Sequence, residues 1–259
     1  VYDAGLAVPS TDGTPAGGGM MAAAMATGGI ASETVQFVSD GFSIGAFLAR
    51  PAEAARPAPA LLLLHEWWGL TEHVKDVARQ CARDGYVALA PDLYARLGAK
   101  IAATPEEAAA LMNGVSSQAV LRDLNAATTY LKAQPFVDAL RLGVLGFSMG
   151  GTFALTQAAH NSDLKAAVVF YGKVPPIETF RYLLCPVLFH HAAKDGWVTR
   201  QEAERFQQGL ERYGKPGTLQ VYPEADHGFF NDTRPEAYRA QDARLAWDRT
   251  LAFLARHLG

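Results

Sequence analysis

Apolar and polar positions follow two different periods along this chain. After residue 33, short apolar runs of strand length alternate with segments in which apolar residues recur every three or four positions. Two early runs flank an Asp40-Gly41 pair, and Asp-Gly between alternating segments predicts a β-hairpin. The expected strands cover 34–38, 42–48, 60–64, 86–90, 141–145, 166–170, 187–191 and 219–222, and the expected helices cover 71–84, a short element opening at 104–107, 118–132, 150–160, 199–213 and 235–257.

This alternation predicts how the elements pack. Strands separated by helices of ten or more residues indicate crossover connections, and therefore a mostly parallel sheet with helices on both faces. In such sheets a ligand lies at the carboxyl ends of the strands. Polar residues that directly follow predicted strands are therefore the candidates for a functional site, and the main ones are Glu66, Asp92, Ser148, Asp195 and His227.

The segment GFSMG at 146–150 lies between a predicted strand and a predicted helix. In that context Gly-x-Ser-x-Gly indicates a nucleophile elbow and the α/β-hydrolase fold, with a mostly parallel central sheet and helices on both faces. The turn would lift Ser148 above the sheet edge and aim the amide of Met149 at developing negative charge. The plainer alternative is a helix entry in which Ser148 is only an N-cap.

A serine nucleophile needs a base and a group that orients the base. His227 follows the last predicted strand and Asp195 follows the strand before it, which gives the chain order Ser, Asp, His used by this fold. Asp226 is the rival for the acid, but it is adjacent to His227 in sequence and is poorly placed to fold back onto its ring. We expect the amides of Met149 and Trp67 to form the oxyanion hole.

Composition limits the remaining possibilities. The 259 residues are 49% hydrophobic with a net charge of −3, so they lack the basic balance that nucleic-acid binding requires. No apolar run approaches the length of a membrane span, and two cysteines give neither a disulfide framework nor a metal site. We expect a Gly- and Ala-rich extension at 1–32, one domain at 33–259, a monomer or small homo-oligomer, and a cytoplasmic location with export as the alternative.

Five motifs resemble those of the dienelactone hydrolases, also called carboxymethylenebutenolidases. They are LHEWWGL at 64–70, GYVALAPDLYAR at 85–96, GFSMGG at 146–151, FYG at 170–172 and ADHGF at 225–229. The resemblance implies a compact hydrolase without a large cap domain that acts on small lactones or esters with no metal or organic cofactor. It also implies that Glu66 lies beside the nucleophile and that Arg96 contacts a substrate carboxylate.

Two departures from this family change the expected mechanism and the expected substrate. Ser148 stands where the best-known members have cysteine, and Asn231 stands where they have an arginine. Because asparagine cannot replace a bidentate arginine, we expect neutral esters to be preferred over anionic lactones. Anionic lactones, or a non-catalytic binding protein on the same fold, remain the alternatives. Candidate substrate-contacting or nucleophile-assisting side chains are Glu66, Trp68, Tyr94, Arg96, Trp197 and Phe229, in a pocket also flanked by Trp67, Phe147 and Phe230.

Overall fold

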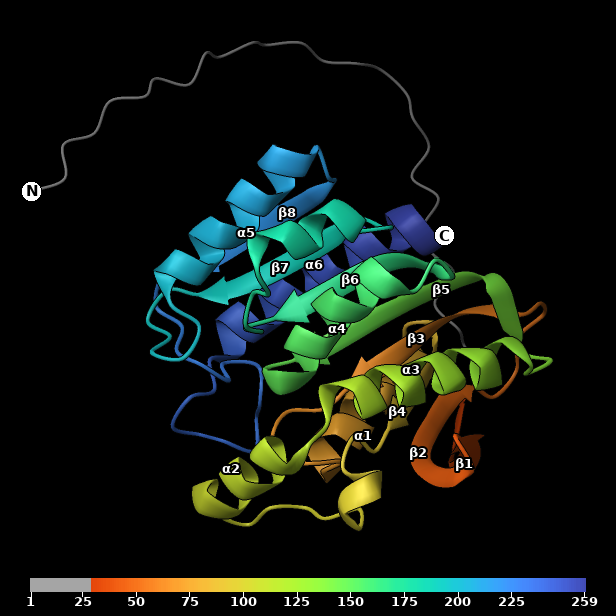
Figure 1. The fold of residues 1–259 in the computed structure, drawn as a ribbon. Helices are drawn as coiled ribbons and strands as arrows, with labels where there is room; N and C mark the ends of the chain where they lie inside the picture. The colour runs from red at the N-terminus through yellow and green to blue at the C-terminus, as the bar shows by residue number, and fades with distance from the viewer. Residues whose placement is uncertain (1–28) are drawn as a thin grey trace, which may run out of the picture.

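A computed structural model describes residues 29–259, which form an eight-stranded sheet between two layers of helices (Figure 1). The strand order across the sheet is β1-β2-β4-β3-β5-β6-β7-β8. The strands are β1 (Ile30–Ser39), β2 (Phe42–Pro51), β3 (Ala58–Leu64), β4 (Val87–Pro91), β5 (Val137–Phe147), β6 (Leu164–Phe170), β7 (Val187–Ala192) and β8 (Gly217–Tyr222).

The β1–β2 hairpin is the antiparallel edge of the sheet. β2 runs antiparallel to both β1 and β4, and the remaining neighbours pair in parallel. Asp40 and Gly41 have φ values of 52° and 73°, as a two-residue hairpin turn requires, so the predicted hairpin is confirmed. β1 begins at Ile30, so residues 30–32 belong to the sheet and not to the expected extension. The expectation for residues 1–28 lies outside the described residues.

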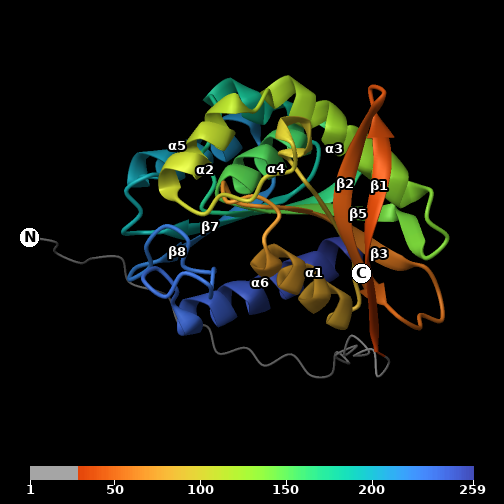
Figure 2. The same cartoon turned by 90° about the horizontal axis from the view of Figure 1, so that it is seen from below.

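The helices divide between the two faces of the sheet. α1 and α6 cover one face, and α3, α4 and α5 cover the other, with α2 beyond the end of α3 (Figure 2). Their bounds are α1 (Glu72–Arg83), α2 (Pro105–Gly114), α3 (Ser117–Lys132), α4 (Met149–His160), α5 (Arg200–Tyr213) and α6 (Ala240–Leu258), with short 3₁₀ helices η1 (Ala95–Leu97) and η2 (Ile177–Tyr182) that the sequence did not predict.

The start of the last helix was predicted wrongly. α6 begins at Ala240 and not at residue 235. The preceding residues form turns, in which the Tyr238 amide donates to the Arg234 carbonyl at 2.9 Å and the Arg239 amide donates to the Phe229 carbonyl at 3.0 Å. These bonds fold the segment back toward the loop that carries His227.

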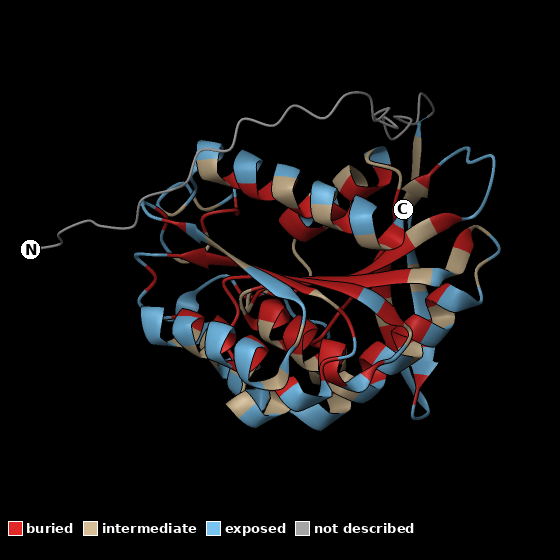
Figure 3. Ribbon diagram, turned by 90° about the horizontal axis from the view of Figure 1, so that it is seen from above, coloured by how far each residue is buried: buried red, intermediate tan, exposed pale blue. Residues whose placement is uncertain are grey.

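The hydrophobic core lies in two layers, one on each face of the sheet. Along β3, Leu62 and Leu64 pack into the layer under α3 and α4, while Leu61 and Leu63 pack into the layer under α1 and α6. Buried residues concentrate on the sheet and on the helix surfaces that meet it (Figure 3). Full burial of one such leucine contributes about 1.5–3 kcal/mol, so the sheet is a rigid base for the loops at its carboxyl edge.

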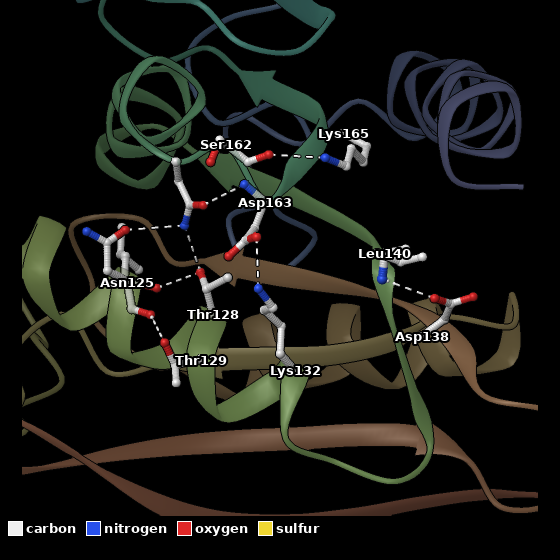
Figure 4. A network of polar contacts seen from close by, with 11 residues as sticks. Asn125, Thr128, Thr129, Lys132, Asp138, Leu140, Ser162, Asp163 and Lys165 are labelled. Carbon is white, nitrogen blue, oxygen red and sulfur yellow. Dashed lines mark hydrogen bonds and ion pairs between the residues drawn. The ribbon is translucent and has the colours of Figure 1, made fainter.

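A polar network fixes α3 against α4 and the start of β6 (Figure 4). Asn161 Nδ2 donates to Asn125 Oδ1 at 3.2 Å and to Thr128 Oγ1 at 3.1 Å. Gln157 Nε2 also donates to Asn125 Oδ1, at 2.7 Å. These contacts hold the two helices at a fixed separation.

Two expectations from composition can be compared with the described residues. Cys81 and Cys185 are both buried as free thiols, as expected, and burial raises the pKa of Cys185 to about 12. None of the helices within residues 29–259 is both long enough and apolar enough to cross a membrane.

Candidate active site

Ser148 occupies the turn between β5 and α4. Its φ of 51° and ψ of −116° lie in a region that non-glycine residues rarely adopt, and such strain is held only where the surrounding structure enforces it. The Ser148 amide donates to the Phe170 carbonyl at 2.9 Å, which ties the turn to the end of β6. The backbone therefore presents the serine hydroxyl above the sheet.

Glycines on either side of Ser148 allow backbones to approach closely. A Cβ at Gly146 would lie 2.1 Å from the Gly150 carbonyl oxygen. A Cβ at Gly150 would lie 2.3 Å from the Leu64 carbonyl oxygen. Both distances are shorter than any real contact, so the glycines of the GFSMG motif are required by packing as well as by the turn.

Three side chains form a continuous hydrogen-bonded chain at this turn. Ser148 Oγ lies 2.8 Å from His227 Nε2, and His227 Nδ1 lies 2.7 Å from Asp195 Oδ2. Because a carboxylate only accepts, Nδ1 carries the proton and Nε2 is free to accept one from the serine. The structure thus pairs His227 with Asp195, as the sequence analysis expects, and not with the neighbouring Asp226.

Asp195 is itself fixed by backbone donors. It is buried, and its Oδ1 accepts from the amides of Trp197 at 2.7 Å and Val198 at 2.9 Å. Hydrogen bonds to the charged form stabilise a carboxylate. Oδ1 therefore anchors the group while Oδ2 orients the His227 ring.

The two amides expected to form the oxyanion hole are free to donate. Within residues 29–259, the N–H groups of Trp67 and Met149 have no hydrogen-bond acceptor. The Tyr94 hydroxyl donates to the Trp67 carbonyl at 2.8 Å and lies 3.5 Å from Met149 Sδ, which links the two segments. Tyr94 is fully buried, so it holds the loop and does not contact a substrate.

A cavity of about 340 Å³ opens beside the Ser148 hydroxyl. Most of its lining is apolar. Among the described residues that line it, Lys173 is the one lysine, and no arginine, aspartate or glutamate is present. Its walls are Trp67, Met112, Val115, Ser117, Leu121, Ser148, Met149, Thr152, Phe153, Thr156, Tyr171, Lys173, Trp197, Val198 and His227.

Glu66 is buried close to the site but is held by two other side chains. Its Oε1 accepts from the Tyr171 hydroxyl at 3.2 Å, and its Oε2 accepts from Asn231 Nδ2 at 2.6 Å. Burial and the adjacent Glu66 raise the pKa of Tyr171 well above its usual value, so this hydroxyl keeps its proton and remains a donor. In the described part of the chain, Glu66 has no hydrogen bond to Ser148, contrary to the assisting role that the resemblance implies.

The structure places Arg96 away from the cavity and pairs it with another side chain, which argues against the expected substrate contact. Its Nε and Nη2 donate to the two carboxylate oxygens of Asp123 at 2.9 Å and 2.8 Å, and Nη2 also donates to the Ser39 carbonyl at 3.0 Å. Arg96 is not among the residues that line the cavity. The bidentate pair joins η1 to α3 and uses the donors that a substrate carboxylate would need.

The aromatic residues that line the cavity are only partly those expected. Trp197 lines the cavity with half of its surface exposed, and its ring lies 5.3 Å from that of Trp67. Trp68 lies outside the cavity lining and stacks under Arg234, whose guanidinium carbon is 3.6 Å from the ring centroid. Phe229 is fully buried in the core, and Phe147 and Phe230 are nearly so. All three pack on the sheet face under α1 and α6.

Sequence reasoning missed ten of the fifteen residues that line the cavity, and two of these ten follow a predicted strand directly. Tyr171 and Lys173 line the cavity immediately after β6. The Lys173 ammonium lies 5.5 Å from the Trp197 ring centroid. The position of FYGK at the carboxyl end of a predicted strand was the available signal, since other polar residues were chosen by that criterion.

An eight-stranded sheet of this order, with a serine at the turn after β5 bonded to a histidine and an aspartate, defines the α/β-hydrolase fold. The model of the Dienelactone hydrolase family matches residues 44–258. The chain belongs to the dienelactone hydrolase family.

Individual relatives agree with this assignment. A protein of Methylorubrum extorquens named "Putative carboxymethylenebutenolidase" is 36% identical over 236 residues, which cover 86% of this chain and 80% of that protein. A protein of Bradyrhizobium sp. named "Probable 2-oxo-3-(5-oxofuran-2-ylidene)propanoate lactonase" is 34% identical, with 90% and 98% covered. The crystal structure of a "Putative Dienelactone Hydrolase" from Klebsiella pneumoniae superposes with a TM-score of 0.83 at 34% identity and covers 88% of this chain and 99% of that one. These likenesses make the chain a dienelactone hydrolase-like hydrolase.

Proposed function

We propose that this protein is a serine hydrolase that cleaves small esters or lactones through an acyl-enzyme intermediate. The observation that carries the proposal is the continuous chain from Ser148 through His227 to Asp195, with 2.8 Å and 2.7 Å between the bonded atoms. A base within hydrogen-bond distance activates a serine that is otherwise a weak nucleophile.

The geometry supports the following sequence of steps. His227 Nε2 takes the hydroxyl proton as Ser148 Oγ attacks the carbonyl carbon, and Asp195 stabilises the imidazolium. The amides of Trp67 and Met149 stabilise the oxyanion. His227 then protonates the leaving alkoxide, the C–O bond breaks, and water attacks the acyl-serine by the same route in reverse. In a lactone the alcohol stays attached to the acyl group.

Neutral esters are the proposed preferred substrates. The cavity lining is mainly apolar, Arg96 is paired with Asp123, and Asn231 donates to Glu66. Neither Arg96 nor Asn231 lines the cavity, so the carboxylate clamp implied by the family is not assembled there. An apolar pocket favours a substrate without an uncompensated charge, because burying a charge is unfavourable.

Hydrolysis of anionic lactones is the second candidate, and Lys173 is the observation that favours it. Lys173 lines the cavity, and its ammonium has no carboxylate within ion-pair distance among the described residues. The Bradyrhizobium relative is named as a lactonase. Comparing kcat/KM for a neutral and a carboxylate-bearing lactone of equal size separates the candidates, and Lys173→Met would selectively reduce the anionic rate if the second is right.

The test of the proposed activity is hydrolysis of p-nitrophenyl acetate by the protein and by Ser148→Ala. We expect the substitution to reduce kcat by at least about a thousandfold, because removing a triad member leaves only the oxyanion hole and binding. Retained folding, measured by circular dichroism, is the control. Wild-type rates in Ser148→Ala would contradict the assignment, and an inactive wild-type protein would favour a non-catalytic binding protein on this fold.

A further inference from the structure

One face of α4 forms a wall of the cavity that leads away from Ser148. Met149, Thr152, Phe153 and Thr156 all line the cavity, and their spacing of three and four places them on a single helix face. A helix rises 1.5 Å per residue, so the wall from Ser148 to Thr156 is about 12 Å long. The cavity is therefore an elongated groove and not only a socket around the nucleophile.

The opposite wall comes from the end of α2 and the start of α3. Met112, Val115 and Leu121 line the cavity from this segment, together with Ser117. Three of these four side chains are apolar and face an α4 surface that carries Met149 and Phe153. The groove therefore presents apolar surface from both sides.

The hydroxyl groups of the two threonines on the α4 wall both donate to backbone carbonyls one helical turn earlier in the chain. Thr156 Oγ1 donates to the Thr152 carbonyl at 2.9 Å, and Thr152 Oγ1 donates to the Ser148 carbonyl at 3.4 Å. Thr152 Oγ1 also accepts from the Lys173 amide at 2.9 Å. A polar substituent in the groove would find few free donors, so burial of an apolar group is favoured there.

The α2–α3 wall of the groove and the proton donor lie on different sides of Ser148. α3 packs on β1, β3, β4 and β5, whereas Asp195 and His227 follow β7 and β8 at the other end of the sheet. The leaving alcohol must receive its proton from His227 Nε2. The part of an ester that extends along α4 toward α3 is therefore the acyl group.

The groove is preformed because its walls are tied together. Asn125 on α3 accepts from Gln157 on α4 at 2.7 Å and from Asn161 at 3.2 Å. Gln157 follows directly after Thr156, so these bonds fix the helix separation at the far end of the groove. A preformed site binds its ligand without an ordering penalty.

Resting on the proposed hydrolase activity, we propose that this groove is an acyl-chain subsite for medium-chain carboxylic esters. A carbon chain with bonds of about 1.5 Å advances about 1.3 Å per carbon, so a chain of about eight carbons, about 10 Å long, occupies most of a 12 Å groove. The Lys173 amide donates a hydrogen bond to Thr152 Oγ1, one helical turn from the nucleophile, and the Lys173 ammonium lies 5.5 Å from the Trp197 ring centroid, so the distal groove carries no charged side chain among the described residues. The preferred acid is therefore an unbranched, uncharged acyl chain.

The experiment measures kcat/KM for p-nitrophenyl esters from acetate to dodecanoate with the full chain. Each buried methylene contributes about 0.8 kcal/mol, or about fourfold in kcat/KM, so the value should rise steadily to about eight carbons and then stop rising. Thr156→Phe fills the distal end and should move the maximum to chains about three carbons shorter. Val115→Phe tests the opposite wall without altering α4.

Thr129→Phe is the matched control. Thr129 lies on the exposed side of α3, and its hydroxyl donates to the carbonyl four residues earlier, at 3.1 Å, as that of Thr156 does (Figure 4). We expect its chain-length maximum to stay at about eight carbons. A profile that is flat or falls from acetate would overturn the subsite while leaving the hydrolase activity standing. Absence of turnover with every ester, with no labelling of Ser148 by a fluorophosphonate, would overturn both.

Discussion

Substitution of Asn231 by aspartate tests the contact that replaces the expected carboxylate clamp. Asn231 is 3% exposed, and its Nδ2 donates to Glu66 Oε2 at 2.6 Å. Its Oδ1 accepts from the amide and hydroxyl of Thr233 at 3.1 Å and 2.7 Å. Asn231→Asp keeps the shape and the Thr233 contacts but turns the donor into a second carboxylate oxygen beside Glu66.

The size of the stability loss in Asn231→Asp follows from the proton that the new aspartate and Glu66 would have to share. Two carboxylates about 3 Å apart repel by about 5 kcal/mol at an effective dielectric constant of 20, so one of them takes up a proton and its pKa rises above the unfolded value of about 4. Because this pKa is higher in the folded state than in the unfolded state, the variant is most stable below the unfolded pKa, and its stability falls as the pH rises. Between pH 5 and 8 the variant should lose about 3–4 kcal/mol relative to the wild type, at about 1.4 kcal/mol per pH unit.

The assay is urea denaturation of the wild type and Asn231→Asp at pH 5 and pH 8. The difference in unfolding free energy between the two proteins should widen strongly at pH 8. Asn231→Ala is the control, since it removes the donor without adding a charge and should give a deficit of about 1.5–3 kcal/mol that changes little with pH. An equal deficit for Asn231→Asp at both pH values would refute the inferred contact with Glu66.

Three further predictions concern the elbow, the core and the Arg96–Asp123 pair. Gly150→Ala should destabilise the fold by more than about 3 kcal/mol in urea denaturation, because its Cβ would lie 2.3 Å from the Leu64 carbonyl oxygen; a change below about 1 kcal/mol would contradict the close packing. Burial lowers the pKa of His190 to about 3, so the unfolded chain binds a proton that the folded chain does not, and stability rises with pH up to about 6.5. Relative to His190→Asn, the wild type should lose about 2 kcal/mol between pH 7.5 and 5, and parallel profiles would exclude this effect. Arg96→Met should lower stability by about 1–3 kcal/mol, because it leaves the buried Asp123 carboxylate without its bidentate partner, and should leave kcat/KM for neutral esters unchanged, whereas a selective rise in KM would return Arg96 to the site.

The sheet and the triad could be predicted because their signals are local. Strands such as β3 are continuous apolar runs, and the turn after β5 needs glycines within two residues of Ser148. Asp195 and His227 each directly follow a strand, and parallel strands bring their carboxyl ends to one edge. The order of strands alone therefore placed the three side chains together.

The rest of the site depends on contacts between distant segments. Asp123, which binds Arg96, lies in the middle of α3, and nothing in the PDLYAR motif indicates that partner. Asn231 and Glu66 are 165 residues apart in the sequence, so their hydrogen bond could not be predicted from the residues around either one. The groove depends on how the α2–α3 corner packs beside α4, and helical periodicity fixes a buried face without fixing its neighbour.

The most direct test of the account is active-site labelling with a fluorophosphonate followed by peptide mass spectrometry. The account predicts one adduct, on Ser148, whose rate of formation falls by orders of magnitude in His227→Ala while the fold is retained. Asp226→Asn should label at the wild-type rate, because His227 is oriented by Asp195. Absence of labelling in the folded wild-type protein, or labelling that does not depend on His227, would contradict the claim that Ser148 is an activated nucleophile.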